Sequence, residues 1–290
     1  MAGPYAEYSL FFILAFSVYP LLVRNYINRL DYKRFVFIFT LFNAVGAIVV
    51  AYLLGSTFSF TIPFLFIIAF LGFLNVLGFY CSFYAYENER ASIVLPIVAS
   101  QFLFISLISG LLRQGLAIST VVSLPLLFVG ILLVSRKRDN RMNRALPLAV
   151  AAAVTAMLAW SLMWVLFGYL LGQAQPLGNY ALLALFSFAW SALATMLLVS
   201  KVKNTKMKRV IARGSEHAIA PGLLNGAGTV IFSAAFAVSS VETPLLALAS
   251  SPIAIILAIA ILKERANKYE IAGIVVILAT LAIVAFGAKL

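Results

Sequence analysis

Long runs of apolar residues, separated by short polar connections, make up most of the chain. Each run has about the 17–25 residues that a helix needs to cross the hydrocarbon core of a bilayer. None alternates apolar and polar residues as the strands of a membrane barrel do. The pattern therefore predicts an all-α polytopic membrane protein with ten transmembrane helices. The predicted spans are residues 5–23, 35–54, 61–84, 91–112, 116–135, 145–171, 180–200, 218–239, 243–262 and 271–286.

Composition and charge support this prediction. Of the 290 residues, 64% are hydrophobic and 10% are charged, which excludes an ordinary soluble domain. The net charge of +12 comes from basic connections, because 19 of the 21 Lys and Arg residues lie in the odd-numbered ones. Basic connections face the cytoplasm, which places both termini outside. We expect a multi-pass protein of a prokaryotic plasma membrane, in contact with membrane lipids and not with nucleic acid.

A motif is repeated in the two halves of the chain. Residues 72–78 and residues 222–228 both read G-x-L-N-x-x-G, and they carry Asn75 and Asn225 inside apolar runs. An amide is costly in a bilayer unless it finds partners, and glycines let another helix or a ligand approach the backbone. Matching motifs in two halves indicate a duplicated protein with its working site between the copies.

The duplication predicts two five-helix repeats, residues 1–144 and residues 145–290. Because five is an odd number, the second repeat enters the membrane from the opposite side, so the repeats are inverted. The match continues beyond the asparagines, since residues 91–100 align with residues 242–251 as a Pro- and Ser-bearing helix. Since both halves are present, one chain is able to work as a monomer.

The second half carries three motifs of a known family. They are T-P-L-L-A-L at 243–248, L-K-E-R-A at 262–266 and Y-E-I-A-G-I at 269–274. With the inverted halves, they resemble the drug/metabolite transporter superfamily and its ten-helix metabolite-exporter (EamA-like) group. The resemblance is strong over residues 221–287 and weaker in the first half, where Arg113-Gln114 replaces Glu-Arg.

The resemblance implies a central cavity lined by the third, fourth, eighth and ninth helices. It also implies export or exchange of small metabolites, often amino acids, by alternating access. Members of the family usually keep both termini in the cytoplasm, so the outside termini predicted here put the transport direction in doubt.

Neutral polar residues and aromatic rings in the spans are the candidates for binding a substrate. Asn75 and Asn225 are the first candidates. An amide inside a transmembrane helix either holds helices together through hydrogen bonds, as interhelical glue, or contacts the substrate. Trp160 and Trp164 are four residues apart and therefore share a helix face. The candidate substrate-binding residues are Tyr19, Asn75, Tyr80, Tyr84, Gln101, Trp160, Trp164, Asn225 and Ser251.

Charged residues are missing from the middle of every predicted span. Many ion-coupled transporters carry protons on an intramembrane carboxylate, so the sequence favours a facilitator or exchanger. Without a buried Lys or Arg, a phosphorylated substrate is disfavoured. No nucleophile–base pair, metal-ligand set or phosphate loop is present, so we expect no enzyme, no metal and no cofactor.

The sequence therefore predicts a secondary transporter for a small neutral or zwitterionic metabolite, with amino acids first. A flippase for lipids or lipid precursors is the alternative within transport. An intramembrane lipid enzyme and a non-transporting scaffold are the alternatives outside it.

Overall fold

The computed structural model describes most of the chain as a bundle of helices. The described residues are 3–27, 32–57, 61–113, 145–170, 177–199, 216–240, 242–248, 250–263 and 268–287, with short pieces between 122 and 133. They contain no strand, and seven helices are long and apolar enough to cross a membrane. The prediction of an all-α membrane protein is confirmed. The fifth predicted span, residues 116–135, lies mostly outside the described residues, so the count of ten stays a prediction.

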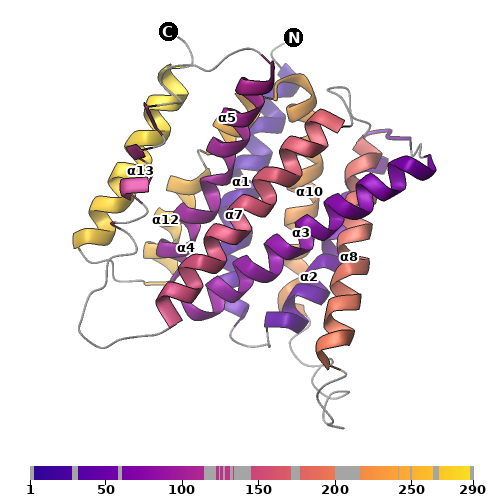
Figure 1. The fold of residues 1–290 in the computed structure, drawn as a ribbon, viewed down its shortest axis with the longest axis horizontal. Coiled ribbons are helices and arrows are strands. Elements are labelled where there is room, and N and C mark those ends of the chain that lie inside the picture. Colours follow the sequence, from indigo (N-terminus) through magenta and orange to yellow (C-terminus); the bar gives the residue numbers. More distant parts are fainter. Residues whose placement is uncertain are drawn as a thin grey trace.

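The helices follow the predicted spans closely. The helices are α1 (Gly3–Ile27), α2 (Tyr32–Leu53), α3 (Ile62–Asn88), α4 (Ala91–Ala99), α5 (Gln101–Arg113), α7 (Ala145–Leu170), α8 (Leu177–Val199), α10 (Glu216–Val238), α11 (Glu242–Ala247), α12 (Ser250–Ile261) and α13 (Lys268–Gly287). Both chain ends are marked at the same end of the bundle (Figure 1).

The fourth and ninth predicted spans are each broken into two helices. The first break is at Ser100, between α4 and α5, and the second lies between α11 and α12. Ser100 Oγ donates a hydrogen bond to the carbonyl oxygen of Ile97 at 2.6 Å, and Ser250 Oγ donates to that of Ala247 at 2.7 Å. A serine hydroxyl that donates to the carbonyl three residues earlier competes with the backbone hydrogen bonds of the helix. The same side-chain hydrogen bond therefore accompanies both breaks.

The two central helices make matching contacts. α3 packs against α7 and α8, while α10 packs against α1 and α2. The broken helices also contact each other across the two halves, because α4 packs against α12 and α5 packs against α11. Each half of the chain is therefore packed mainly through the other half, and the middle of the molecule lies between them.

Close backbone approach joins α10 to α2. A Cβ atom on Gly222 would lie 2.7 Å from the carbonyl oxygen of Phe39, and one on Gly46 would lie 2.6 Å from that of Leu223. A Cβ on Gly226 would overlap the carbonyl oxygen of Asn43. These helices pack through small residues. In a membrane the surrounding lipid is as apolar as the side chains, so helices associate through close packing and not through the hydrophobic effect.

A glycine contact and side-chain hydrogen bonds together join α3 to α8. A Cβ on Gly72 would lie 2.7 Å from the Cβ atom of Phe186 and 3.2 Å from the backbone nitrogen of Ser187. Trp190 Nε1 donates to the carbonyl oxygen of Ala69 at 2.8 Å, and the Tyr80 hydroxyl lies 2.7 Å from Thr195 Oγ1. The two seams related by the repeated motif thus share close glycine contacts, and the α3–α8 seam adds hydrogen bonds that satisfy polar groups within the membrane.

Candidate functional site

A cavity of about 60 Å³ lies where the two halves meet, beside both helix breaks. On the same measure a single water molecule needs about 15 Å³, so the cavity is larger than a single-water site. None of the described residues that line it is charged. The lining residues are Phe16, Tyr19, Pro20, Asn75, Phe79, Tyr86, Leu95, Val98, Ala99, Gln101, Phe102, Trp160, Met163, Trp164, Tyr180, Asn225, Thr229, Ser250, Ser251 and Ala254.

Asn75 reaches the cavity from α3 with both ends of its amide already bonded. Its Nδ2 donates to Ser187 Oγ of α8 at 2.9 Å, and its Oδ1 accepts from Trp160 Nε1 of α7 at 2.9 Å. The side chain therefore ties three helices together at a site that is 2% exposed. Its geometry favours the role of interhelical glue, and through the Trp160 bond it also positions an indole ring in the cavity wall.

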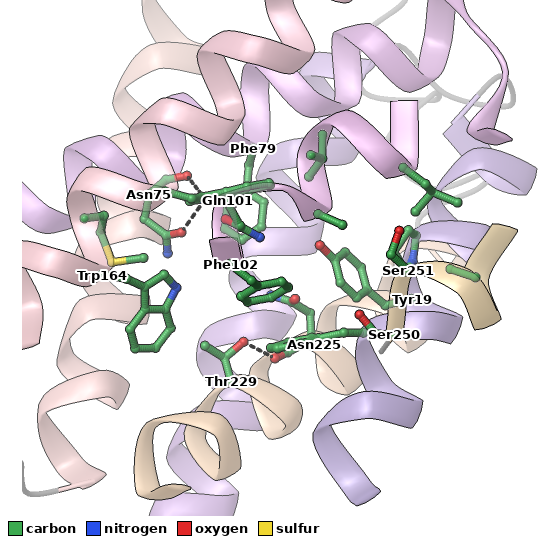
Figure 2. A pocket seen from close by; sticks show the side chains of 18 of the residues that line it. Tyr19, Asn75, Phe79, Gln101, Phe102, Trp164, Asn225, Thr229, Ser250 and Ser251 are labelled. Carbon is green, nitrogen blue, oxygen red and sulfur yellow. Dashed lines mark hydrogen bonds between the residues drawn. The ribbon is translucent and has the colours of Figure 1, made fainter. Parts of the chain in front are cut away.

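Asn225 occupies the matching place on α10, but its amide is not used in the same way. Its backbone carbonyl accepts from Thr229 Oγ1 at 2.6 Å, while its side chain makes no hydrogen bond to any described residue (Figure 2). The residue lines the cavity and is only 4% exposed. An amide in this position has one donor and one acceptor group to offer a ligand.

Gln101 and Ser251 bring further polar groups to the cavity, one from each helix that follows a break. Gln101 Oε1 and Ser251 Oγ are buried and make no hydrogen bond within the described part of the chain. Tyr19 and Trp164 also line the cavity, and neither makes a side-chain hydrogen bond to a described residue. The side chains drawn in Figure 2 surround one space from several helices. Acceptors and donors therefore line a cavity whose wall is otherwise mostly apolar and aromatic.

Two of the predicted site residues lie elsewhere. The Tyr80 hydroxyl bonds Thr195 of α8, and the ring of Tyr84 packs edge-on against Tyr32 of α2 with centroids 5.6 Å apart. Neither residue lines the cavity. Both lie on α3 beyond Asn75, but their side chains are directed to α2 and α8. The other seven candidates all line the cavity, and their role in binding stays a prediction.

The structure adds residues that the sequence pattern does not single out. Tyr180, near the start of α8, stacks its ring on Trp164 with centroids 5.8 Å apart and planes at 3°. Tyr180 is 1% exposed and lines the cavity. Tyr180 is the first residue of its apolar run, where a tyrosine is usually an interfacial anchor, so no signal distinguished it.

Aromatic rings gather around the cavity. Phe39 of α2 packs edge-on against Phe79 and Phe83 of α3, with centroids 5.0 and 4.9 Å apart. Phe232 of α10 contacts Phe12 at 5.4 Å and Trp164 at 4.8 Å. Tyr19 and Phe16 connect the two groups through further ring contacts. Edge-to-face rings fill space densely yet separate without breaking hydrogen bonds, so this network is able to rearrange around a ligand.

Comparison with known proteins agrees with the helical architecture. A solved structure described only as "Crystal structure of protein" is 15% identical and covers 99% of this chain and 98% of its own, with a TM-score of 0.58. At that identity the likeness shows a shared fold alone. No curated protein matches the chain.

A family model, by contrast, matches the first half. The motifs that indicated the drug/metabolite transporter superfamily lie mostly in the second half, so the two observations cover different parts of the sequence. Residues 7–136 match the EamA-like transporter family, which confirms the resemblance to that superfamily.

Proposed function

We propose that this protein is a secondary transporter that moves a small neutral or zwitterionic metabolite, with amino acids as the first candidates. The observation that carries the proposal is the cavity between the two halves. It is uncharged, walled by apolar and aromatic side chains, and supplied with polar groups that have no partner among the described residues. A cavity of this kind suits a solute with an apolar part and a small polar head.

Alternating access is the mechanism that we propose for it. The reciprocal contacts of α3 with α7 and α8, and of α10 with α1 and α2, are those expected of two inverted repeats. Breaks beside the cavity in two corresponding helices support the same view, because discontinuous helices often form midplane binding sites. Rocking of the repeats would open the cavity to one side of the membrane at a time.

The charge distribution supports an exchanger or facilitator over a proton antiporter. A proton-coupled cycle commonly needs an intramembrane carboxylate that faces the pathway. No described residue in the cavity wall is a carboxylate. A lipid flippase is not favoured, because the matching family is one of transporters of small metabolites.

Counterflow in proteoliposomes tests the proposal. Liposomes that contain the purified protein would be preloaded with a mixture of unlabelled amino acids, with pH and ions equal on both sides. We expect concentrative uptake of at least one labelled amino acid, unchanged by a protonophore, because exchange needs no ion gradient in the absence of a coupling carboxylate. Protein-free liposomes are the control. If no amino acid is taken up, amino acids are not the substrates. Loss of uptake with the protonophore would contradict uncoupled exchange.

A further inference from the structure

Two deeply buried polar side chains without partners lie beside the two helix breaks. Gln101, 8% exposed, is the first residue of α5, and Ser251, 2% exposed, is the second residue of α12. Gln101 Oε1 and Ser251 Oγ make no hydrogen bond within the described residues, and both residues line the cavity. A buried polar atom that stays unsatisfied is costly, so each of these atoms is prepared for a partner that the described residues do not supply.

The two groups differ in what they accept. An amide oxygen only accepts hydrogen bonds, so Gln101 Oε1 requires an N–H or O–H donor from the ligand. The Ser251 hydroxyl is able to donate, and it lies in the first turn of α12, where the helix dipole favours a negative charge. The pair therefore matches a ligand that carries a donor at one point and an anionic acceptor at another.

The rest of the wall excludes ligands with a net charge. No described residue in the wall has a charge that would neutralise an ammonium or a carboxylate on its own. Moving an uncompensated ion out of water into such a wall is expensive, whereas a zwitterion brings its own opposite charge. Phe16, Phe79 and Phe102 complete the wall with aromatic rings and add no charge to it.

We propose that Gln101 and Ser251 form the polar end of the substrate site and select α-amino acids over the corresponding amines and carboxylic acids. Gln101 Oε1 accepts from the ammonium group, and the Ser251 hydroxyl donates to the carboxylate at the start of α12. The inference rests on the transport function proposed above and goes further, because it assigns each end of the substrate to a residue.

The experiment compares three families of probes. Equilibrium binding to the full-length purified protein would be measured for labelled L-alanine, L-valine and L-phenylalanine. Competition would come from ethylamine, isobutylamine and phenethylamine, and from propionate, 3-methylbutanoate and 3-phenylpropionate. In the wild-type protein we expect at least one amino acid to bind, and its amine and carboxylate analogues to bind at least about tenfold more weakly.

Substitutions then separate the two contacts. Gln101→Met keeps the length of the side chain without the amide, and should weaken binding of the amino acid and the amine about tenfold while leaving the carboxylate unchanged. Ser251→Ala should weaken the amino acid and the carboxylate by a similar factor, and Ser251→Thr should retain binding. The matched control is Ser191→Ala, because the Ser191 hydroxyl is also buried and unpartnered among the described residues but does not line the cavity.

The outcomes separate this inference from the transport proposal. If amino acids exchange in liposomes but their amines and acids compete equally, or if Gln101→Met and Ser251→Ala behave like Ser191→Ala, the selection mechanism is wrong and transport stands. If no amino acid binds or exchanges, the proposed substrate class and this inference both fail. Thermal unfolding of each variant distinguishes loss of binding from loss of folding.

Discussion

Asn225→Ala should reduce amino-acid counterflow at least about tenfold while leaving the stability of the purified protein almost unchanged. The Asn225 amide lines the cavity and makes no hydrogen bond to a described residue, so its removal breaks no contact that holds the bundle. It does remove a donor and an acceptor from the wall, and one lost hydrogen bond to a charged ligand group is worth about 1.5–3 kcal/mol.

The equivalent substitution in the first repeat should behave differently. Asn75→Ala leaves Ser187 Oγ and Trp160 Nε1 without their partner on α3, and should lower the free energy of unfolding by about 1–3 kcal/mol. Counterflow and thermal unfolding of both variants in the same detergent provide the comparison. Equal losses of stability in the two variants would contradict the proposal that Asn75 holds helices together while Asn225 contacts the substrate.

Gly226→Ala should destabilise the protein more than any other single methyl addition to these helices. The added Cβ would overlap the carbonyl oxygen of Asn43 and lie 2.9 Å from the backbone nitrogen of Ala47. Both obstacles are backbone atoms of α2, so no side-chain rotation relieves them and the two helices must separate. Overpacking of this kind costs about 3 kcal/mol, and we expect a large fall in the yield of folded protein.

A second glycine provides the control for this prediction. In Gly168→Ala the added Cβ meets the ring edge of Phe236 at 2.9 Å, which is the far end of a side chain and not backbone. A side chain yields more readily than backbone, so this variant should lose about 1 kcal/mol and less than Gly226→Ala, measured by thermal unfolding of both. If the two variants are equally stable, then α2 and α10 are not held by close backbone contact.

The two seams share one kind of contact. Gly222 and Gly226 bring α10 close to the backbone of α2, and Gly72 brings α3 close to the backbone of α8. The α3–α8 seam adds the side-chain hydrogen bonds of Asn75 and Tyr80. The glycines of the repeated motif therefore have the same packing role in both halves, while the asparagines differ.

The sequence by itself determined the class of the protein and the position of most helices. Apolar runs of spanning length leave few alternatives, because a backbone in hydrocarbon must satisfy its own hydrogen bonds within a helix. The repeated asparagine motif and the lack of charge in the spans pointed to a neutral site between two halves. Seven of the nine candidates line one cavity in the structure, and the family resemblance was confirmed over residues 7–136.

Only the tertiary structure decided which way each side chain faces. Membrane helices that are apolar on all sides carry no amphipathic stripe, so the sequence leaves their rotation undetermined. Close packing against a neighbouring helix sets that rotation instead. Tyr80 and Tyr84 therefore turn away from the cavity while Tyr180 enters it. For the same reason the two matching motifs differ. The Asn75 side chain is bonded between helices, whereas the Asn225 side chain makes no hydrogen bond to a described residue.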